Sequence, residues 1–446
     1  METYDGFKNK RVIVLGYGRS GRSAVSALVA LGAHVVLTTN EVISDERVRQ
    51  TMKGWGVEIV DGHHPASLLN DAELIVKNPG IPYEIDFLQE ASKRGIPIMT
   101  EVEIAYHISE APIIGITGTN GKTTVTHLIG EMLERSGLNP ILCGNIGYPA
   151  TSAAKEAGGD SILVMELSSF QLMGVYEFKP DTAVITNIYE AHIDYHGSVE
   201  AYEAAKLNLL RNMDETDKLI FNGMQKEKLE KLDHAINTEY FSIESEASAC
   251  IKEGMITYKD TPLIPVDDVK LMGGHNHENM LAAILAAKAH GATDEAIIKT
   301  LSEFGGIPHR MEYLGTHKGA AYYNDSKATN NLATSFALRS FKTPVIWVAG
   351  GLDRGQSLDN LIPQMTRVRM IITFGETKEK FIELAKETRK EVVSAENPFD
   401  AIQVAAEISE LGDTVLFSPA CASWDQYKDY EARGDHFKEG FSILEN

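Results

Sequence analysis

Cysteine, long apolar runs and signal-like segments are scarce or missing in this sequence. Its three cysteines, Cys143, Cys250 and Cys421, are far apart and form no metal-binding or disulfide pattern, which suits a reducing compartment. No apolar run is long enough to span a bilayer, and residues 1–10 are charged rather than apolar. These absences predict a cytoplasmic protein without a membrane partner.

Basic residues are also in short supply. The chain has 42 Lys and Arg against 63 Asp and Glu, a formal net charge of −21. This balance argues against nucleic acid or an anionic membrane as the main partner, because both attract basic surfaces. A small anionic substrate stays possible, since a local patch can oppose the net charge. At 446 residues the chain is too long for one typical core, so we expect two to four domains.

Residues 113–124 are the strongest motif in the chain. An apolar strand runs into the turn Thr-Gly-Thr-Asn-Gly-Lys-Thr-Thr, and a helix-compatible segment follows over residues 125–135. Backbone N–H groups of such a turn and helix N-terminus point at an anion. Lys122 can reach the outer phosphates, and the Thr123 hydroxyl can bind the accompanying magnesium. The two glycines are closer than in the common Walker motif, but the strand-to-helix boundary favours a triphosphate site over an empty turn.

A second glycine-rich turn lies near the start of the chain. Residues 11–15 predict a strand, 16–21 have the Gly-x-Gly-x-x-Gly spacing, 22–31 predict a helix and 34–37 a second strand. NAD binding would require an acidic residue at the end of that second strand. Thr38-Thr39-Asn40 stands there instead, so the turn favours another nucleotide diphosphate over NAD.

The loop after the predicted strand at residues 73–77 is a further candidate. It contains Asn78-Pro-Gly and stands at a strand's carboxyl end, where open α/β sheets bind ligands. A plain Pro-Gly turn explains the same residues equally well.

Two buried strands after the phosphate loop end in polar residues. The strand at 161–165 ends at Glu166, and the strand at 181–186 is followed by His192. Parallel strands bring such ends to one sheet edge, where Glu and His can complete a divalent metal site beside a nucleotide. Each alone is more often a capped strand-end residue, but their combination with the phosphate loop favours a metal site.

Other polar residues on helices leave their roles open. Lys206 lies in the helix predicted over 199–210, where a lysine is ordinarily on the solvated face. His275, Asn276 and Asn279 precede a helix predicted over 280–290 and can contact a nucleotide or cap the helix. Residues 224–268 predict a peripheral strand-and-loop segment without recognisable chemistry.

The C-terminal part repeats the pattern of strands that meet polar, glycine-rich turns. Such turns follow the predicted strands at residues 320–323, 344–349, 370–374 and 414–417. This arrangement is typical of a doubly wound sheet with a ligand edge.

The whole pattern predicts an α/β protein of three domains: a Rossmann-like domain (1–110), a P-loop ATPase-like domain (111–306) and a second Rossmann-like domain (307–446). The simplest chemistry joins two substrates at the expense of a nucleoside triphosphate. A carboxylate becomes an acyl phosphate, which the second substrate attacks, and domain closure excludes water.

Motifs along nearly the whole chain resemble those of the Mur ligases. They lie at residues 118–123, 166–171, 192, 204–206, 275–279, 309–310, 324–330 and 418–423. The resemblance implies amide formation between UDP-N-acetylmuramoyl-L-alanine and D-glutamate, with ATP and two Mg²⁺ ions, in peptidoglycan precursor synthesis.

The resemblance also assigns residues. It implies catalytic roles for Lys122, His192 and Lys206. ATP contacts are implied for Gly118, Thr119, Asn120, Gly121, Lys122, Thr123, Thr124, Asn279, Arg310 and Asp325. The metal ligands would be Thr123, Glu166, His192 and Lys206, the last as a carbamylated lysine.

Two substrate pockets are implied in the same way. The UDP substrate would be bound by Gly16, Tyr17, Gly18, Arg19, Ser20, Thr39 and Asn78, with Asn145 at its sugar-peptide portion. D-Glutamate would be bound by His192, Lys327, Thr329, Arg354, Ser423 and Tyr430.

The sequence departs from the family pattern at two positions. Some relatives have a lysine where this chain has Arg354, and some have an arginine where it has Asn40. The contact at Arg354 and the uridine contacts near Asn40 therefore stay open.

Three alternatives remain. A folylpolyglutamate synthase or another Mur ligase shares the central motifs, but is not expected to combine them with the first turn and the loop at 418–425. A nicotinamide oxidoreductase lacks support because the strand-end acid is missing. A non-catalytic nucleotide-binding regulator would not release phosphate in response to both substrates. No extended apolar assembly surface is evident, so we expect a monomer.

Overall fold

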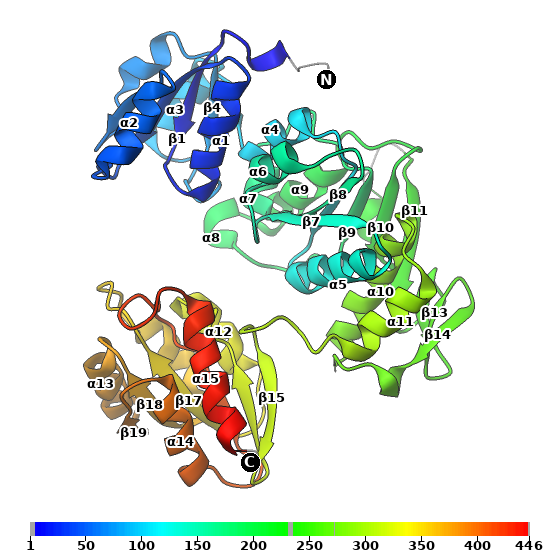
Figure 1. The fold of residues 1–446 in the computed structure, drawn as a ribbon, viewed down its shortest axis with the longest axis vertical. Coiled ribbons are helices and arrows are strands. Elements are labelled where there is room, and N and C mark those ends of the chain that lie inside the picture. Colours follow the sequence, from blue (N-terminus) through cyan, green and yellow to red (C-terminus); the bar gives the residue numbers. More distant parts are fainter. Residues whose placement is uncertain (1–4, 231–234, 272, 445–446) are drawn as a thin grey trace. The chain divides into compact units, whose positions relative to one another are not determined.

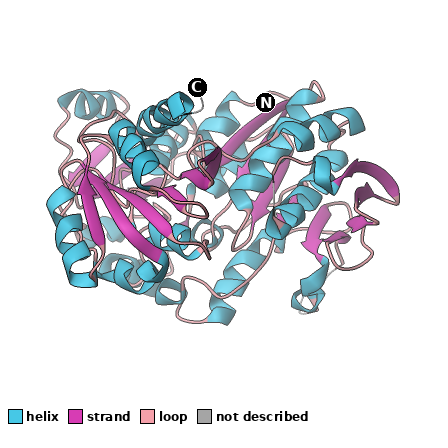
Figure 2. Ribbon diagram, turned by 90° about the horizontal axis from the view of Figure 1, so that it is seen from below, coloured by secondary structure: helices cyan, strands magenta, loops and turns pink. Residues whose placement is uncertain are grey.

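The chain forms two compact units, Met1–Phe304 and Gly305–Asn446. The computed structural model describes residues 5–230, 235–271 and 273–444. Within the first unit two sheets follow each other along the chain, and the second unit holds a third sheet (Figure 1). Helices flank the strands of these sheets (Figure 2). The α/β class predicted from the sequence is therefore confirmed.

The first sheet is parallel and has the strand order β3-β2-β1-β4-β5. Its order reverses between β1 and β4, and in open α/β sheets ligands bind at such a switch point. The strands are β1 (Arg11–Leu15), β2 (His34–Thr39), β3 (Glu58–Asp61), β4 (Leu74–Lys77) and β5 (Ile98–Met99), with helices α1 (Arg19–Ala30), α2 (Glu46–Gly54), α3 (Asp86–Lys93) and α4 (Glu101–Ile108).

The second sheet has the order β14-β13-β12-β11-β10-β9-β6-β8-β7 and is parallel from β7 to β12. Residues 255–265 add two antiparallel strands at one edge, so the segment expected to be peripheral lies there. The strands are β6 (Ile113–Thr117), β7 (Asn139–Gly144), β8 (Ser161–Glu166), β9 (Thr182–Ile185), β10 (Lys218–Asn222), β11 (Asn237–Ser242), β12 (Ala249–Lys252), β13 (Met255–Tyr258) and β14 (Thr261–Pro265).

Helices of this central part carry five of the candidate site residues, Lys122, Thr123, Thr124, Lys206 and Asn279. They are α5 (Lys122–Arg135), α6 (Ala150–Glu156), α7 (Ser169–Leu172), α8 (Ile193–His196), α9 (Val199–Leu207), α10 (Gly274–Ala289) and α11 (Asp294–Glu303). None of the described helices is long and apolar enough to cross a membrane.

The second unit has a sheet with the order β15-β16-β20-β17-β18-β19, in which only the β15–β16 pair is antiparallel among the described strands. Its strands are β15 (Glu312–His317), β16 (Ala320–Asn324), β17 (Val345–Gly350), β18 (Val368–Phe374), β19 (Glu391–Ser394) and β20 (Thr414–Phe417), and its helices are α12 (Asn331–Arg339), α13 (Lys378–Thr388), α14 (Pro398–Ile408) and α15 (Tyr430–Leu444).

Central strands are continuous apolar runs because helices cover both of their faces. Every residue of β6, β8 and β17 is buried. Polar side chains therefore lie where these strands end, and within each sheet the carboxyl ends of the parallel strands meet at one edge. The candidate site residues lie at these edges.

Three helices begin earlier than the sequence predicted. Helix α1 begins at Arg19 rather than 22, α5 at Lys122 rather than 125, and α10 at Gly274 rather than 280. Each is preceded by a glycine, Gly18, Gly121 or Gly273. The lysine and hydroxyl residues of the phosphate loop thus form the first turn of α5.

Two buried glutamates of α4 join the first sheet to the central part of the same unit. Glu101 accepts hydrogen bonds from the backbone N–H groups of Ala150 and Thr151, at 3.0 and 2.9 Å, and thereby caps α6. Glu103 accepts the N–H groups of Tyr176, Glu177 and Phe178 at 2.7–3.2 Å. These carboxylates fix the helix next to the cavities described below.

Candidate active site

The phosphate loop has a backbone shape that only glycine allows at two positions. Gly118 and Gly121 have φ values of +149° and +85°. A Cβ on Gly118 would lie 1.9 Å from the Thr186 hydroxyl oxygen, and one on Gly121 would lie 2.0 Å from the Asn279 side-chain oxygen. The N-terminus of α5 then points its N–H groups at an anion.

The end of β9 supports this loop. Asn187 Oδ1 accepts the Asn120 N–H at 2.9 Å, and the Thr186 hydroxyl donates to the Asn120 carbonyl at 2.6 Å. The Thr119 hydroxyl lies 3.1 Å from the Tyr202 hydroxyl. Sequence analysis did not assign roles to Thr186, Asn187 or Tyr202, although their place after a buried strand and before Lys206 was the available signal.

Two lysines converge on the loop. Lys122 Nζ donates to the carbonyl groups of Gly118 and Thr119 at 2.9 and 3.0 Å. Lys206 Nζ donates to the same Gly118 carbonyl at 2.7 Å and lies 4.7 Å from the Tyr202 ring centroid. The loop carbonyl groups therefore accept hydrogen bonds from two amines, one on the helix that follows the loop and one on α9.

Lys206 is buried, at 1% exposure, so its ordinary placement on a solvated helix face is wrong. Helical periodicity did not reveal this, because the face of α9 carrying Lys206 packs under the loop. Burial and the charge of Lys122 together lower the pKa of Lys206 to about 6, with Glu166 partly opposing them. The amine is therefore mostly neutral at pH 7.

Glu166 ends β8, next to β6, and is 1% exposed. Its Oε1 accepts the Asn145 amide at 2.8 Å, whereas its buried Oε2 has no hydrogen-bond partner among the described residues. A buried carboxylate oxygen without a partner fits a cation ligand.

The donor set suits Mg²⁺. With Glu166 and the buried hydroxyl of Thr123, it offers the oxygen ligands that Mg²⁺ prefers, the rest coming from phosphate and water. Within the described ranges, no three His, Cys, Asp or Glu side chains lie close enough to hold a metal by themselves.

His192 precedes α8 with a left-handed backbone, φ +53°. Its exposed ring packs edge-on against Phe170, at 5.3 Å between centroids, and lies 6.0 Å from the Tyr202 ring. The neighbouring His196 is hydrogen-bonded to the Ser169 hydroxyl at 3.0 Å. His192 is thus placed beside Tyr202, which contacts both the loop and Lys206.

The first sheet carries a cavity of about 600 Å³ at its switch point. Of the residues predicted to bind a UDP substrate, five line it: Gly16, Tyr17, Gly18, Thr39 and Asn78. Glu41 lines it too. Arg19, Ser20 and Asn145 line a neighbouring cavity of about 310 Å³, which also includes Asn78.

His64 is a cavity residue that sequence analysis missed. It lines the larger cavity, and its Nδ1 lies 2.8 Å from the Thr38 hydroxyl oxygen. Burial lowers the pKa of His64, so its neutral form is favoured. The available signal was its position just after β3, at the same sheet edge as the glycine-rich turn.

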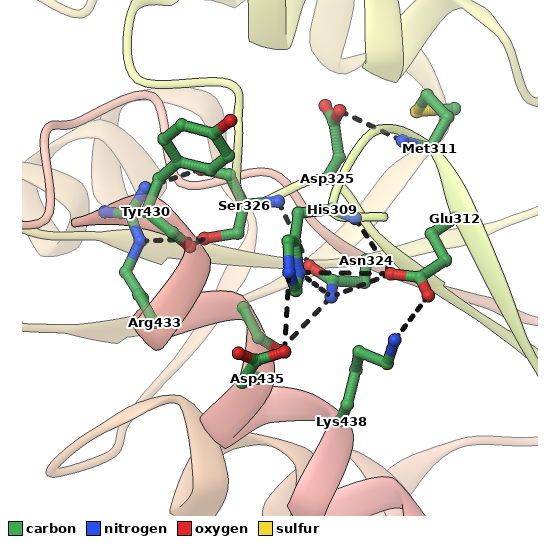
Figure 3. Close-up of polar contacts among 11 residues, drawn as sticks. His309, Met311, Glu312, Asn324, Asp325, Ser326, Tyr430, Arg433, Asp435 and Lys438 are labelled. Atoms are coloured by element: carbon green, nitrogen blue, oxygen red, sulfur yellow. Dashed lines mark hydrogen bonds and ion pairs between the residues drawn. The ribbon is translucent and has the colours of Figure 1, made fainter. Parts of the chain in front are cut away.

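The C-terminal unit has its own buried polar network (Figure 3). Asp325, at the end of β16, accepts hydrogen bonds from the Ser418 hydroxyl at 2.9 Å and the Met311 N–H at 3.1 Å. Burial raises the pKa of Asp325 to about 7. His309 accepts the Lys327 N–H at its carbonyl, at 3.0 Å, and its ring lies 3.0 Å from the Asn324 amide nitrogen.

Arg433 is the organising residue of this network and was also missed. It is fully buried and donates to the Ser326 hydroxyl (3.1 Å), the Ser326 carbonyl (2.7 Å) and the Cys421 carbonyl (2.9 Å). It therefore ties the turn after β16 to the loop after β20. The signal for it was the helical spacing of Arg433 with Phe437 and Phe441, which places all three on the buried face of α15.

Of the predicted D-glutamate residues, Lys327 and Thr329 lie in the turn after β16, Ser423 in the loop after β20 and Tyr430 at the start of α15, whereas Arg354 follows β17 and His192 belongs to the first unit. Lys327 Nζ lies 5.8 Å from the Tyr430 ring centroid, and Ser423 is buried. Exposed Arg354 stacks on Trp424, at 4.7 Å, next to Ser423. Thr329 donates its N–H to the Lys327 carbonyl at 2.9 Å. Arg310 and Asp325 also belong to this unit, so their ATP contacts stay predictions, whereas Asn279 lies against Gly121.

Comparison with known proteins shows which class of enzyme this is. Three family models match in chain order: "Mur ligase MurD-like, N-terminal domain" over residues 10–100, "Mur ligase middle domain" over 116–287, and "Mur ligase, glutamate ligase domain" over 309–421. These matches, one for each sheet, define a ligase built from three α/β domains.

Full-length relatives make the assignment firm. The UDP-N-acetylmuramoylalanine–D-glutamate ligase of Staphylococcus haemolyticus (strain JCSC1435) is 49% identical over 442 residues, covering 99% of this chain and 98% of the relative. That of Staphylococcus aureus (strain N315) is also 49% identical, with the same coverage. This chain belongs to the Mur ligase family.

Solved structures support the fold. A pseudomurein peptide ligase type C from Methanothermus fervidus has a TM-score of 0.52 at 19% identity, covering 98% of this chain and 100% of that one. UDP-N-acetylmuramate-alanine ligase from Thermotoga maritima has a TM-score of 0.52 at 18% identity, covering 97% and 99%.

Proposed function

We propose that this chain is an ATP-dependent ligase that adds D-glutamate to UDP-N-acetylmuramoyl-L-alanine in peptidoglycan precursor synthesis. The observation that carries this function is the identity of about one residue in two with D-glutamate ligases over the whole chain. The phosphate loop with its two lysines supports the use of ATP. We further propose that the chain acts in the cytoplasm, where a nucleotide-linked substrate would be used, and that it is a monomer. Its domains would cover residues 1–110, 111–306 and 307–446.

The first step joins the alanine carboxylate to phosphate. A carboxylate oxygen attacks the γ-phosphorus of ATP, the bond to the β-phosphate oxygen breaks, and ADP leaves. Residues 118–124 hold the phosphates through backbone N–H groups, and Lys122 turns from the loop carbonyls toward the charge that develops on the transferring group. Asn279, Arg310 and Asp325 complete the proposed ATP contacts.

Thr123, Glu166, His192 and Lys206 would hold two Mg²⁺ ions, which neutralise phosphate charge when bound. The unpartnered oxygen of Glu166 supports its role as a ligand. A neutral Lys206 amine can add to CO₂ and release one proton, which leaves a carbamate whose oxygens suit the same metal site.

The second step forms the amide. The amine of D-glutamate attacks the acyl carbonyl carbon, phosphate leaves, and the amine loses a proton. Lys327 and Arg354 suit the two carboxylates of D-glutamate, while Thr329, Ser423 and Tyr430 offer hydroxyls, and His192 would face both substrates. Gly16, Tyr17, Gly18, Arg19, Ser20, Thr39, Asn78 and Asn145 would hold the UDP substrate along the two cavities.

The test is ATP-dependent phosphate release by the purified chain with magnesium and UDP-N-acetylmuramoyl-L-alanine. D-Glutamate is compared with L-glutamate, D-alanine, L-lysine and diaminopimelate. Release with D-glutamate alone is the expected result. Release with another amino acid would keep the ligase chemistry and overturn the proposed amino acid, and no release with any of them would overturn the function.

A further inference from the structure

A buried lysine that the proposed mechanism does not use lies beneath the substrate cavities. Lys77 is the last residue of β4 and is 1% exposed. It directly precedes the loop of residues 78–81, which we call the cavity loop. Asn78 and Ile81 of this loop line the larger cavity, and Asn78, Pro79 and Gly80 line the smaller one.

The direct contacts of the Lys77 ammonium group are all neutral. Its Nζ lies 3.4 Å from the Asn78 carbonyl oxygen, 3.2 Å from the Pro79 carbonyl oxygen and 3.5 Å from the Tyr195 hydroxyl. The ring centroid of Tyr83 lies 4.4 Å away. Among the described residues no carboxylate contacts Lys77 directly, and Glu84 acts on it only through space. A buried cation without a contacting counter-charge is costly, so its contacts with the loop call for an explanation.

Tyr195 also binds carbonyl groups of the cavity loop. This residue of α8 donates to the carbonyl groups of Pro79 at 3.4 Å and Ile81 at 3.2 Å. Its ring stacks edge-on with Phe170, at 4.5 Å, and Phe170 lines the smaller cavity and packs against His192. Lys77 and Tyr195 thus share the Pro79 carbonyl and link the cavity loop to the helix that follows His192.

We propose that Lys77 is a positioning residue for the UDP-linked substrate: together with Tyr195 it turns the carbonyl groups of the cavity loop away from the cavities and fixes the loop to α8. The diphosphate of the substrate is anionic, and carbonyl oxygens that faced it would repel it. With those oxygens held by Lys77 and Tyr195, the Asn78 side chain, which lines both cavities, faces the ligand.

This inference deepens the proposed function, because it takes the UDP-linked substrate as the ligand of the two cavities. The affinity for the UDP-linked substrate depends on a contact beneath the cavity loop, whereas ATP binds at the phosphate loop. The two affinities should therefore respond differently to loss of Lys77.

The experiment compares three variants by titration calorimetry with UDP-N-acetylmuramoyl-L-alanine, and with UDP alone. Lys77→Met removes the cation, Tyr195→Phe removes one hydroxyl and keeps the ring, and Lys93→Met is the matched control at an exposed position of α3. We expect substrate affinity to fall about tenfold for Lys77→Met and about threefold for Tyr195→Phe, the scale of charged and neutral hydrogen bonds. The KM for ATP and the affinity of Lys93→Met stay at the wild-type values.

A pH series adds a readout that a purely structural role would not produce. Burial lowers the pKa of Lys77 to about 8, and Glu84 partly opposes this. The other titratable groups that face Lys77 are the hydroxyls of Tyr83 and Tyr195, whose pKa burial raises, to about 12 for Tyr195. Wild-type substrate affinity is therefore expected to weaken as pH rises from 7 to 9.5, and Lys77→Met to lose that part of the pH dependence.

The outcomes separate the two proposals. Unchanged affinity of both Lys77→Met and Tyr195→Phe overturns the positioning role, as does an equal loss for UDP substrate, ATP and D-glutamate. If Lys77→Met does not fold, Tyr195→Phe decides alone. If wild type binds UDP but releases no phosphate with any amino acid, the proposed function fails, and the UDP titrations still decide whether Lys77 positions the loop.

Discussion

The phosphate loop of the central part and the turn after β16 in the C-terminal unit are both strand-to-helix turns, but they present polar groups differently. The phosphate loop is shaped by backbone, with Gly118 and Gly121 in conformations that exclude a side chain. The turn after β16 is shaped by buried side chains, with Asp325 and Arg433 as its anchors. The proposed ligands fit this difference: backbone can hold an unvarying phosphate, whereas side chains are needed to distinguish one amino acid from another.

The largest effect should come from the cation of the phosphate loop. Lys122→Ala removes the amine that would neutralise the transferring phosphoryl group, so we expect the rate of phosphate release to fall about 10³-fold. The KM for D-glutamate should stay near wild type. Steady-state kinetics measures both, with Lys252→Ala, at an exposed site on β12, as the control. A loss below tenfold would contradict the assigned role.

Glu166→Gln tests the metal site beside the phosphate loop, because it removes the charge of the side chain and keeps its shape. The variant retains the hydrogen bond with Asn145 but loses the anionic oxygen proposed to bind metal. We expect activity to fall about 10²-fold and half-maximal activity to require more Mg²⁺. A magnesium titration measures this, and an unchanged requirement would remove Glu166 from the metal site.

Arg433→Met tests the other turn. Three acceptors on Ser326 and Cys421 lose their donor, so we expect a loss of about 2–3 kcal/mol in the free energy of unfolding of the C-terminal unit. The KM for D-glutamate should rise about tenfold, because the two loops it joins carry Lys327 and Ser423. Arg433→Lys is the matched variant that keeps the charge. Lower stability with an unchanged KM would limit Arg433 to a structural role.

The mildest perturbation is a change of pH, which titrates Asp325. Its folded-state pKa is about 7, raised by burial from an unfolded value of 3.8. The stability gained from protonation is therefore fully present below pH 3.8 and is lost as pH rises through 7. Between these values wild-type stability should fall by at most about 1.4 kcal/mol per pH unit from this group. Asp325→Asn should lack that slope, as denaturant unfolding at pH 5 and 8 would show.

The backbone-shaped site was largely visible in the sequence, because glycine spacing between a strand and a helix is local information. The α/β class, the turn at residues 118–124 and the lack of a Rossmann-type acid at Asn40 all follow from short stretches of sequence. The family resemblance supplied the role of Lys206, which local pattern placed on the solvent face.

The side-chain-shaped parts were hidden because burial of a charged residue depends on distant partners. Arg433 meets Ser326 across more than a hundred residues of chain, and Lys77 meets Tyr195 in the same way. His64 reaches its cavity because β3 lies beside β2. No single stretch contains both partners, so a helical or strand pattern carries no sign of them.

The crowding at Gly118 and Gly121 has a consequence for inhibitor design. Any substitution at either glycine drives a new carbon into Thr186 or Asn279, so the enzyme has little freedom to vary this surface and keep its ATP site. A compound that makes its main contacts with the backbone of this loop therefore faces few single-step routes to resistance. Compounds that rely on exposed side chains such as Arg354 can lose their contacts through a single substitution.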